Sequence, residues 1–357
     1  MKRIVVCADG TWNRPSATTN GVPCPTNVVR IAQGLAPSDT TGVTQVVFYH
    51  DGVGTHPGVD RILGGMFGIG LDRIICDIYR FLVHNFEPGD ELFFFGFSRG
   101  AFTVRSLAGM IRKCGVLKKH KVDQVASAFD FYRSEVKPAD PAAAAWRAER
   151  SNETRITCIA VWDTVGALGI PLTPLRYFAR RKYQFHDVSL STTVDNAFHA
   201  LAIDERREPF LPAVWQVQSP DPLHPQTVRQ VWFAGVHSDI GGGYANSDLS
   251  DITLCWMIQQ TQGCGLAFEP AITAGVTGDP CGPLHDSMTW YYRILGNGTR
   301  VIDDPTPVPT PLEAYPVSFE ELHLSVLVRF DAAGAGSQPY DPQPLADYFN
   351  RVSSREA

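Results

Sequence analysis

The 357-residue sequence lacks the features that define several classes of protein. Its eight cysteines form no C-x-x-C pair, and their spacing matches neither a zinc site nor a small disulfide scaffold. We therefore expect reduced thiols, as in a cytoplasmic protein. Basic residues are not in excess, and a formal net charge of -6 argues against a general nucleic-acid-binding protein.

Long apolar runs are missing as well. No stretch approaches the roughly 18 apolar residues of a membrane span. The apolar run near the N-terminus is too short for a signal peptide, and no A-x-A-like cleavage site follows it. We therefore expect a cytoplasmic protein, with export by a route that reads no N-terminal signal left open. The 44% hydrophobic content is that of a globular protein with a large core.

Short apolar runs alternate with helical patterns along the chain. The strand-like runs lie at 3–8, 44–50, 91–97, 154–162 and 228–236, and the helical patterns at 70–86, 99–114 and 248–261. Continuous apolar strands separated by helices predict an α/β fold, α/β-hydrolase-like, with a mostly parallel central sheet and helices on both faces.

The predicted domain is single and covers residues 1–330. Lid or insertion segments are expected at about 115–150 and 170–225, because these stretches lie outside the strand–helix alternation. Residues 331–357 begin with a stretch rich in Gly, Ala and Pro, which indicates a C-terminal tail.

Polar residues follow each predicted strand. They are Asp9, Asp51, Ser98, Asp163 and His237. Ligands of open parallel sheets bind at the carboxyl ends of the strands, so these residues mark the expected site.

The segment Gly96-Phe97-Ser98-Arg99-Gly100 matches the G-x-S-x-G nucleophile elbow. It follows a predicted strand and opens a predicted helix, as that motif requires. Such a turn needs residues without bulk on both sides of the serine, and it points the helix N-terminus at the reacting carbonyl. Ser98 is therefore the predicted nucleophile.

A serine needs a base to take its proton, and the fold's chain order is serine, acid, histidine. Asp163 is the predicted acid because it ends a strand after the nucleophile. His237 is the preferred base, and His285 is the alternative. His199 is a weaker candidate, in a segment that we expect to be helical.

Backbone amides are the expected oxyanion donors. The Arg99 amide is one, and the amide of Gly10 or Thr11, in the loop after the first strand, is the other. Asp9, Asp51 and Asp239 are candidates for binding substrate or an ion. The triad requires neither a metal nor a cofactor.

Two other functions stay open at this point. A metal-assisted phosphoesterase would use Asp9, Asp51, Asp163 and Asp239. A non-catalytic binding or assembly protein would keep only the hydrolase scaffold.

Seven motifs occur in an order that is typical of one family. They are CADGTWN at 7–13, PTNV at 25–28, FYHDGVGT at 48–55, PGDELFFFGFSRGAFTVRSLAGMI at 88–111, VWDTVGALG at 161–169, HALAIDERREPF at 199–210 and VWFAGVHSDIGGGY at 231–244. Over residues 1–300 the chain resembles the α/β-hydrolase-like domain of type VI secretion phospholipase effectors of the first lipase class. This domain also occurs in many bacterial and fungal proteins.

The resemblance implies a Ser-Asp-His serine esterase or lipase that acts on acyl esters, with phospholipase A activity as the known class. By motif it gives Ser98 the role of nucleophile and Asp163 that of the acid. It also implies a lipid or acyl-ester substrate, peripheral membrane contact, and secretion machinery or an immunity protein as partners. The chain is shorter than the larger effectors, and we expect it to lack their membrane-binding modules. The basic and aromatic segment at 172–185 would suit anionic lipid head groups, or else forms a solvated surface.

Overall fold

A seven-stranded sheet forms the centre of the protein, in the order β11-β10-β9-β8-β5-β1-β4. The computed structural model describes residues 1–10, 13, 15–52, 67–165, 190–216, 224–303, 320–334 and 339–356. The strands are β1 (Arg3–Ala8), β4 (Gln45–His50), β5 (Glu91–Phe97), β8 (Ile156–Trp162), β9 (Val194–Ala202), β10 (Thr227–Phe233) and β11 (Glu320–Leu322). Every neighbouring pair is parallel, which confirms the predicted fold class.

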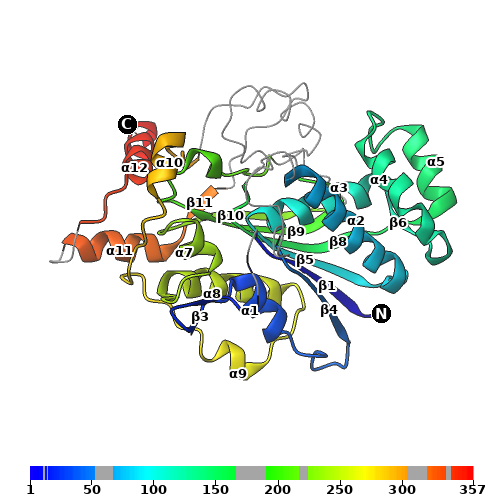
Figure 1. Ribbon diagram of the computed structural model, residues 1–357, viewed down its shortest axis with the longest axis horizontal. Coiled ribbons are helices and arrows are strands. Elements are labelled where there is room, and N and C mark those ends of the chain that lie inside the picture. The colour runs from blue at the N-terminus through cyan, green and yellow to red at the C-terminus, as the bar shows by residue number, and fades with distance from the viewer. Residues whose placement is uncertain are drawn as a thin grey trace.

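Helices cover both faces of the sheet, because the strands are apolar on both sides. In β1, Ile4 and Val6 pack into one core and Val5 and Cys7 into the other. The first core contains α2 (Phe67–Asn85), α3 (Arg99–Cys114) and α4 (Val125–Arg133), and the second contains α1 (Asn27–Gly34) and α8 (Asp248–Gly263). Figure 1 shows α1 and α8 on one side of the sheet and α2 and α3 on the other.

The segment between α3 and β8 folds against the first core. It contains β6 (Val116–Leu117), η1 (Lys119–Gln124), α4, α5 (Pro141–Arg150) and β7 (Ser151–Asn152), with β6 and β7 paired antiparallel. These elements occupy the stretch at 115–150, for which an insertion is predicted. The second predicted insertion, at 170–225, is described at 190–216 and 224–225. These residues include β9, which lies between β8 and β10 in the central sheet, so the expectation of an insertion is wrong for that strand.

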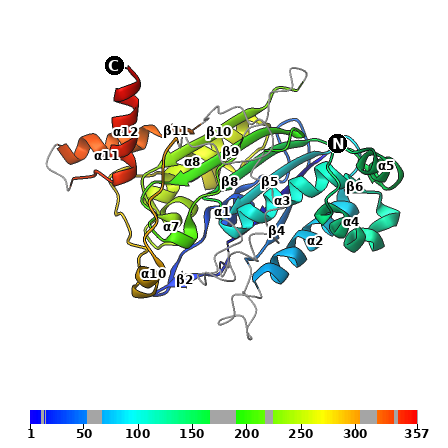
Figure 2. The same ribbon diagram turned by 90° about the horizontal axis from the view of Figure 1, so that it is seen from above.

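A third apolar cluster lies at the β11 edge of the sheet. Here α11 (Leu324–Gly334) and α12 (Gln343–Glu356) pack with the end of β10, and Leu345 and Trp232 are fully buried. Figure 2 shows these two helices at the end of the molecule opposite α4 and α5. The expectation of a tail over 331–357 is therefore wrong for α12, whose apolar residues complete this cluster.

The remaining elements are short. They are β2 (Thr18–Thr19), β3 (Val22–Pro23), η2 (Glu208–Phe210), α7 (His237–Gly241), α9 (Pro270–Thr273) and α10 (Trp290–Leu295). In the part of the chain that the structure describes, no helix is both long and apolar enough to cross a membrane.

Candidate active site

Ser98 lies in the tight turn between β5 and α3. Its backbone is strained, with φ 57° and ψ −120°, in a region that residues with a side chain seldom adopt. A Cβ on Gly96 would lie 2.6 Å from Cα of Ala101, and one on Gly100 would lie 2.1 Å from the carbonyl oxygen of Ala8. The turn therefore requires both glycines, and the predicted strand–turn–helix context of the elbow is confirmed.

The loop after β1 lies beside the serine. A Cβ on Gly10 would be 3.3 Å from Cβ of Ser98, so the Gly10 backbone is close to the hydroxyl-bearing carbon. However, the Gly10 amide donates to Oδ1 of Asp9 at 2.6 Å. Arg99 is the first residue of α3, where backbone amides have no intrahelical acceptor. Thr11 lies outside the described residues.

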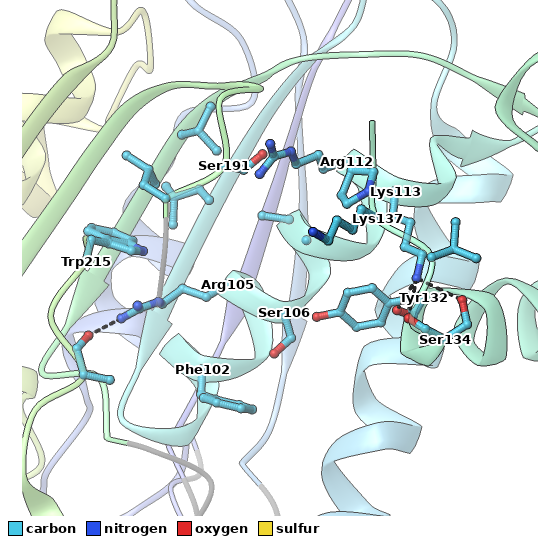
Figure 3. Close-up of a pocket in the computed structure, with 18 residues that line it drawn as sticks. Phe102, Arg105, Ser106, Arg112, Lys113, Tyr132, Ser134, Lys137, Ser191 and Trp215 are labelled. Carbon is cyan, nitrogen blue, oxygen red and sulfur yellow. Dashed lines mark hydrogen bonds between the residues drawn. The ribbon is translucent and has the colours of Figure 1, made fainter. Parts of the chain in front are cut away.

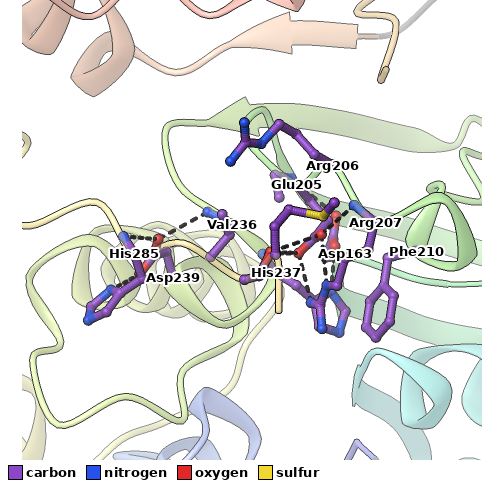
Figure 4. Close-up of polar contacts among 12 residues, drawn as sticks. Asp163, Glu205, Arg206, Arg207, Phe210, Val236, His237, Asp239 and His285 are labelled. Atoms are coloured by element: carbon purple, nitrogen blue, oxygen red, sulfur yellow. Dashed lines mark hydrogen bonds and ion pairs between the residues drawn. The ribbon is translucent and has the colours of Figure 1, made fainter. Parts of the chain in front are cut away.

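Asp163 and His237 form a buried pair at the carboxyl end of the sheet. Asp163 follows β8 and His237 begins α7, and the distance from His237 Nδ1 to Asp163 Oδ2 is 2.5 Å. Asp163 is fully buried and His237 is 5% exposed. Figure 4 shows the two side chains facing one another. This contact leaves Nε2 as the ring nitrogen of His237 that is not used by Asp163.

A buried arginine holds the same carboxylate from another side. Arg300 donates from Nη1 to Oδ1 of Asp163 at 2.6 Å and from Nη2 to Oδ2 at 2.9 Å. Its two nitrogens also donate to the carbonyls of Ala202 and Phe210, at 2.8 and 2.6 Å. The Ala202 amide donates to Asp163 Oδ1 at 3.1 Å. The acid is thus held in place by an ion pair and backbone contacts as well as by the histidine.

These contacts set the charges of the pair. Burial opposes ionisation of Asp163, but the charge of Arg300 and the hydrogen bonds from His237 and Arg300 hold its pKa below the ordinary value. Burial lowers the pKa of His237, and the hydrogen bond and charge of Asp163 only partly offset this. At neutral pH the pair is therefore a carboxylate next to a neutral imidazole, the state that a general base requires.

Aromatic and charged neighbours fix the imidazole. The rings of Phe97 and Phe210 lie 4.6 and 4.9 Å from the His237 ring, measured between centroids. Since Phe97 directly precedes Ser98, the imidazole packs against the elbow. The backbone amide of His237 donates to Oε2 of Glu205 at 3.2 Å.

Glu205 is itself buried, and both of its carboxylate oxygens accept hydrogen bonds. Arg207 donates to both of its oxygens, at 2.9 and 2.7 Å, and the Ser287 hydroxyl lies 3.0 Å from each. Burial opposes its ionisation, yet Arg207 lowers the pKa of Glu205 to about 2. The Arg207 guanidinium lies 3.6 Å above the Phe210 ring. Glu205, Arg207 and Phe210 thus form one connected support for His237.

The alternative base, His285, has a different carboxylate partner. Its Nδ1 lies 2.6 Å from Oδ1 of Asp239, and its ring stacks on Tyr244 at 3.9 Å. Asp239 Oδ2 also accepts the Val236 amide at 3.0 Å. Figure 4 shows this pair apart from His237 and Asp163. The structure therefore places His237, and not His285, on the predicted acid.

His199 lies in β9, so the expectation of a helix there is wrong. The strand pairs with β8 and β10 on its two sides. Its Nε2 accepts the Thr164 amide at 3.1 Å, and burial lowers the pKa of His199 to about 3. This histidine is a neutral residue of the core.

The strand-end aspartates do not gather around a common point. Asp9 accepts from Thr26 at 2.7 Å and from Tyr49 at 2.8 Å, in addition to Gly10. Asp239 binds His285, and Asp51 is half-buried at the end of β4. Among the described residues, no three His, Cys, Asp or Glu side chains are grouped as metal ligands. The contacts of Asp9 and Asp239 indicate that they order the loops around the site.

A comparison with known protein families shows to which family the chain belongs. The model described as "T6SS, Phospholipase effector Tle1-like, catalytic domain" matches residues 2–260. The chain belongs to this family. The match runs from β1 into α8 and so includes Ser98, Asp163 and His237.

Three individual relatives of this Tle1-like domain share between 17 and 31% sequence identity with the chain. An uncharacterized protein of Saccharomyces cerevisiae is 31% identical over 234 residues, which are 58% of this chain and 32% of that protein. A crystal structure of an uncharacterized protein from Pseudomonas aeruginosa has a TM-score of 0.48 at 17% identity, over 78% of this chain and 49% of that one. The Tle1 effector bound to the VgrG spike of the type 6 secretion system has a TM-score of 0.38 at 18% identity, over 68% and 51%. The chain thus spans about a third of the curated relative and half of the solved chains.

Three residues of this Tle1-like site escaped the sequence analysis. Arg300 follows Gly298-Thr299 in a loop, where no motif or periodicity singles it out. Glu205 and Arg207 lie in the motif HALAIDERREPF at 199–210, which contributed only to the resemblance. The five consecutive charged residues at 204–208, directly after an apolar run, are the one signal that could have drawn attention to them.

Proposed function

We propose that this protein is a serine esterase of the lipase type, with Ser98 as nucleophile, His237 as general base and Asp163 as the acid. The observation that carries the proposal is the buried His237–Asp163 pair, with a 2.5 Å contact, packed through Phe97 against the strained turn of Ser98. Strained backbone and a buried acid–base pair occur together where a nucleophile must be activated.

The proposed reaction has two halves. His237 Nε2 takes the proton of Ser98 while Oγ forms a bond to the ester carbonyl carbon, and Asp163 stabilises the imidazolium. The bond from the carbonyl carbon to the leaving oxygen then breaks, and the imidazolium gives its proton to that oxygen, which departs as the alcohol. Water, deprotonated by the same imidazole, then attacks the acyl-enzyme. The bond from the acyl carbon to Ser98 Oγ breaks, the imidazolium returns its proton to Oγ, and the carboxylic acid leaves.

Negative charge on the tetrahedral intermediate needs donors. The proposed donor is the Arg99 amide, at the first position of α3, where the helix dipole also favours an anion. Because the Gly10 amide binds Asp9, its use as second donor would require Asp9 to release it. Thr11 remains the other candidate in that loop.

The proposed substrates are carboxylic esters of lipids, with phospholipase A-like cleavage as the preferred class. Membership in a family of type VI secretion phospholipase effectors supports this class, since the match includes the whole proposed triad. The same membership supports a protein of the type VI secretion machinery as the partner that we propose for delivery. Co-purification of the chain with a spike protein of the same genome would test that part separately.

The direct test compares hydrolysis by the wild type, Ser98→Ala, His237→Gln and His285→Gln. Substrates are a p-nitrophenyl ester series and a fluorescently labelled phospholipid, each with and without a chelator. We expect Ser98→Ala and His237→Gln to lose activity on the order of 1,000-fold or more. His285→Gln is the matched control, because this histidine pairs with Asp239, and its activity should stay within a few-fold of the wild type.

Each other outcome selects a different function. Activity that survives Ser98→Ala but is lost with chelator would point to a metal-assisted phosphoesterase. Silence of the wild type on all esters would favour a binding or assembly protein. Loss of activity in His285→Gln but not in His237→Gln would exchange the two histidines.

A further inference from the structure

Glu205 and Arg207 form an ion pair beside the imidazole of His237. The pair is largely removed from solvent, since the Glu205 side chain is fully buried and that of Arg207 is 12% exposed. Arg207 donates from Nε to Oε1 of Glu205 and from Nη2 to Oε2, and its backbone amide donates to Oε1 at 2.9 Å. This bidentate geometry fixes the two side chains relative to one another.

Each member of the pair reaches His237 by a different route. Oε2 of Glu205 accepts the backbone amide of His237, at the start of α7. The Arg207 guanidinium lies over the Phe210 ring, and that ring meets the imidazole edge to face, with 80° between the ring planes. Figure 4 shows these four residues together. The carboxylate therefore holds the backbone of the histidine, and the guanidinium holds the aromatic ring that packs on its side chain.

The two charges of the pair act on the imidazole with opposite signs. Burial is the main cause of the lowered pKa of His237, and the hydrogen bond and charge of Asp163 offset it in part. Of the other charges, that of Glu205 raises this pKa and that of Arg207 lowers it. Arg300 acts on the imidazole through the Asp163 carboxylate, which it binds. A cation close to the base is thus balanced by an anion at the same place.

We propose that Glu205 and Arg207 are a positioning pair for the general base. Arg207 keeps Phe210 packed on the imidazole, and Glu205 cancels the field of that cation, so that His237 can still accept a proton. An uncompensated cation at this place would weaken the base, because it disfavours the imidazolium that forms when Ser98 loses its proton. The proposal rests on the proposed function, since it concerns the base of that triad.

The pKa of His237, measured by NMR titration of its imidazole, tests the pair. The titration uses the Ser98→Ala protein, which turns nothing over, so the result does not depend on whether the wild type is an esterase. In this background Glu205→Gln leaves the Arg207 cation unopposed, and we expect it to lower the pKa of His237 by about one pH unit. Arg207→Gln should raise this pKa by a similar amount, and the double variant should return close to the parent value.

The opposite signs separate an effect of charge from loosened packing. Because burial lowers the pKa of His237, a variant that merely exposed the imidazole would raise this pKa. A rise in Glu205→Gln, or no change in either single variant, would overturn the proposal. If Glu205→Gln does not fold, Arg207→Lys decides, because it keeps the charge. Its His237 pKa should stay at the parent value while that of Arg207→Gln rises, and equal values in these two variants would overturn the proposal.

Lys113→Gln is the matched control, because it also removes a buried cation. Lys113 is 3% exposed, and its ammonium donates to the carbonyls of Tyr132 and Ser134 (Figure 3). It lies in the last turn of α3, whose 16 residues span about 24 Å, at the end away from the elbow. This is well beyond the Debye length of about 8–10 Å, so the pKa of His237 should equal the parent value. A shift as large as that of Arg207→Gln would overturn the proposal.

Activity of the enzyme with Ser98 intact connects the pair to catalysis. The acid limb of kcat/KM for a p-nitrophenyl ester should follow the pKa of His237, moving to lower pH in Glu205→Gln and to higher pH in Arg207→Gln. An acid limb that stayed in place while the imidazole pKa moved would contradict His237 as the general base, and with it the proposed function, while the effect of the pair on the imidazole would stand.

Discussion

At the scale of single residues, Asp163 is the most constrained group of the site. It has a positive φ of 37°, is fully buried, and makes contacts with His237, Arg300 and the Ala202 amide. A buried carboxylate costs free energy unless it is paired, and here an arginine and a histidine share that task. The arginine keeps the acid ionised, while burial keeps the histidine neutral.

The lowered pKa of His237 predicts the pH dependence of activity. A pKa below the ordinary 6.5 means that the imidazole is protonated, and inactive as a base, only at a pH below that value. We expect kcat/KM for a p-nitrophenyl ester to be at its plateau at pH 7 and to fall with a midpoint below 6.5. A midpoint at or above pH 7 would contradict the burial of a neutral imidazole.

Removal of Arg300 should destabilise the protein. Arg300→Met leaves the Asp163 carboxylate buried without its main counter-charge, and we expect a loss of about 3–5 kcal/mol in the free energy of unfolding. Urea unfolding measures it. Arg206→Met is the control, since that side chain is 57% exposed and its ion pair with Asp286 is worth at most about 1 kcal/mol.

A second substitution separates charge from packing. Asp163→Asn added to Arg300→Met removes the uncompensated charge and should recover part of the lost stability. No recovery, or equal stability of Arg300→Met and Arg206→Met, would show that the ion pair does not hold this part of the core together.

At the scale of elements, the turn from β5 to α3 is the most demanding connection of the fold. It brings two glycines into contact with neighbouring backbone, where no side chain fits. Such a connection is readable from sequence, because only glycine meets the requirement at both positions. The α3 bounds, Arg99–Cys114, are those that the apolar periodicity predicts.

Gly100→Ala tests the close approach of this turn to β1. Its Cβ would lie 2.1 Å from the Ala8 carbonyl oxygen, so we expect a loss of about 1–3 kcal/mol or more in the free energy of unfolding. Gly263→Ala, at the end of α8 with no atom within 4 Å of its Cβ, is the matched control and should be neutral or stabilising. Equal effects of the two substitutions would mean that the turn relaxes freely.

Other elements could not be derived from local pattern. The sequence around His199 looks helical, but this segment forms the strand β9, which lies between β8 and β10. Here the pairing of strands in the tertiary structure outweighs the local preference of the sequence. β11 has only three residues, too few for an alternation to be recognised. The helix α12 follows a Gly- and Pro-rich stretch, and that composition concealed the apolar positions beyond it.

At the scale of the whole molecule, the proposed site joins residues that are far apart in the chain. The strand ends Asp9, Ser98, Asp163 and His237 could be predicted, because parallel strands bring their carboxyl ends to one edge. Arg300 could not, since it reaches Asp163 over 137 positions from a loop of irregular structure. The choice between His237 and His285 likewise needed the three-dimensional pairing with Asp163 and Asp239.

We expect the C-terminal helix α12 to contribute to the stability of the folded protein. Leu345 is fully buried, so Leu345→Ala should cost about 2–5 kcal/mol in the free energy of unfolding. Leu324→Ala removes a side chain from a residue that is 69% exposed and should change stability by less than about 0.5 kcal/mol. Thermal or urea unfolding compares the two, and a Leu345→Ala protein as stable as Leu324→Ala would mean that α12 is dispensable.

The central claim is that Ser98 is an activated nucleophile. Treatment of the purified protein with a fluorophosphonate, followed by peptide mass spectrometry, tests it most directly, because only a serine with a functioning base reacts readily. We predict a single adduct, on the peptide that contains Ser98, which is strongly reduced in His237→Gln and unchanged in His285→Gln. An unmodified Ser98 under these conditions, or modification of another serine, would contradict the account.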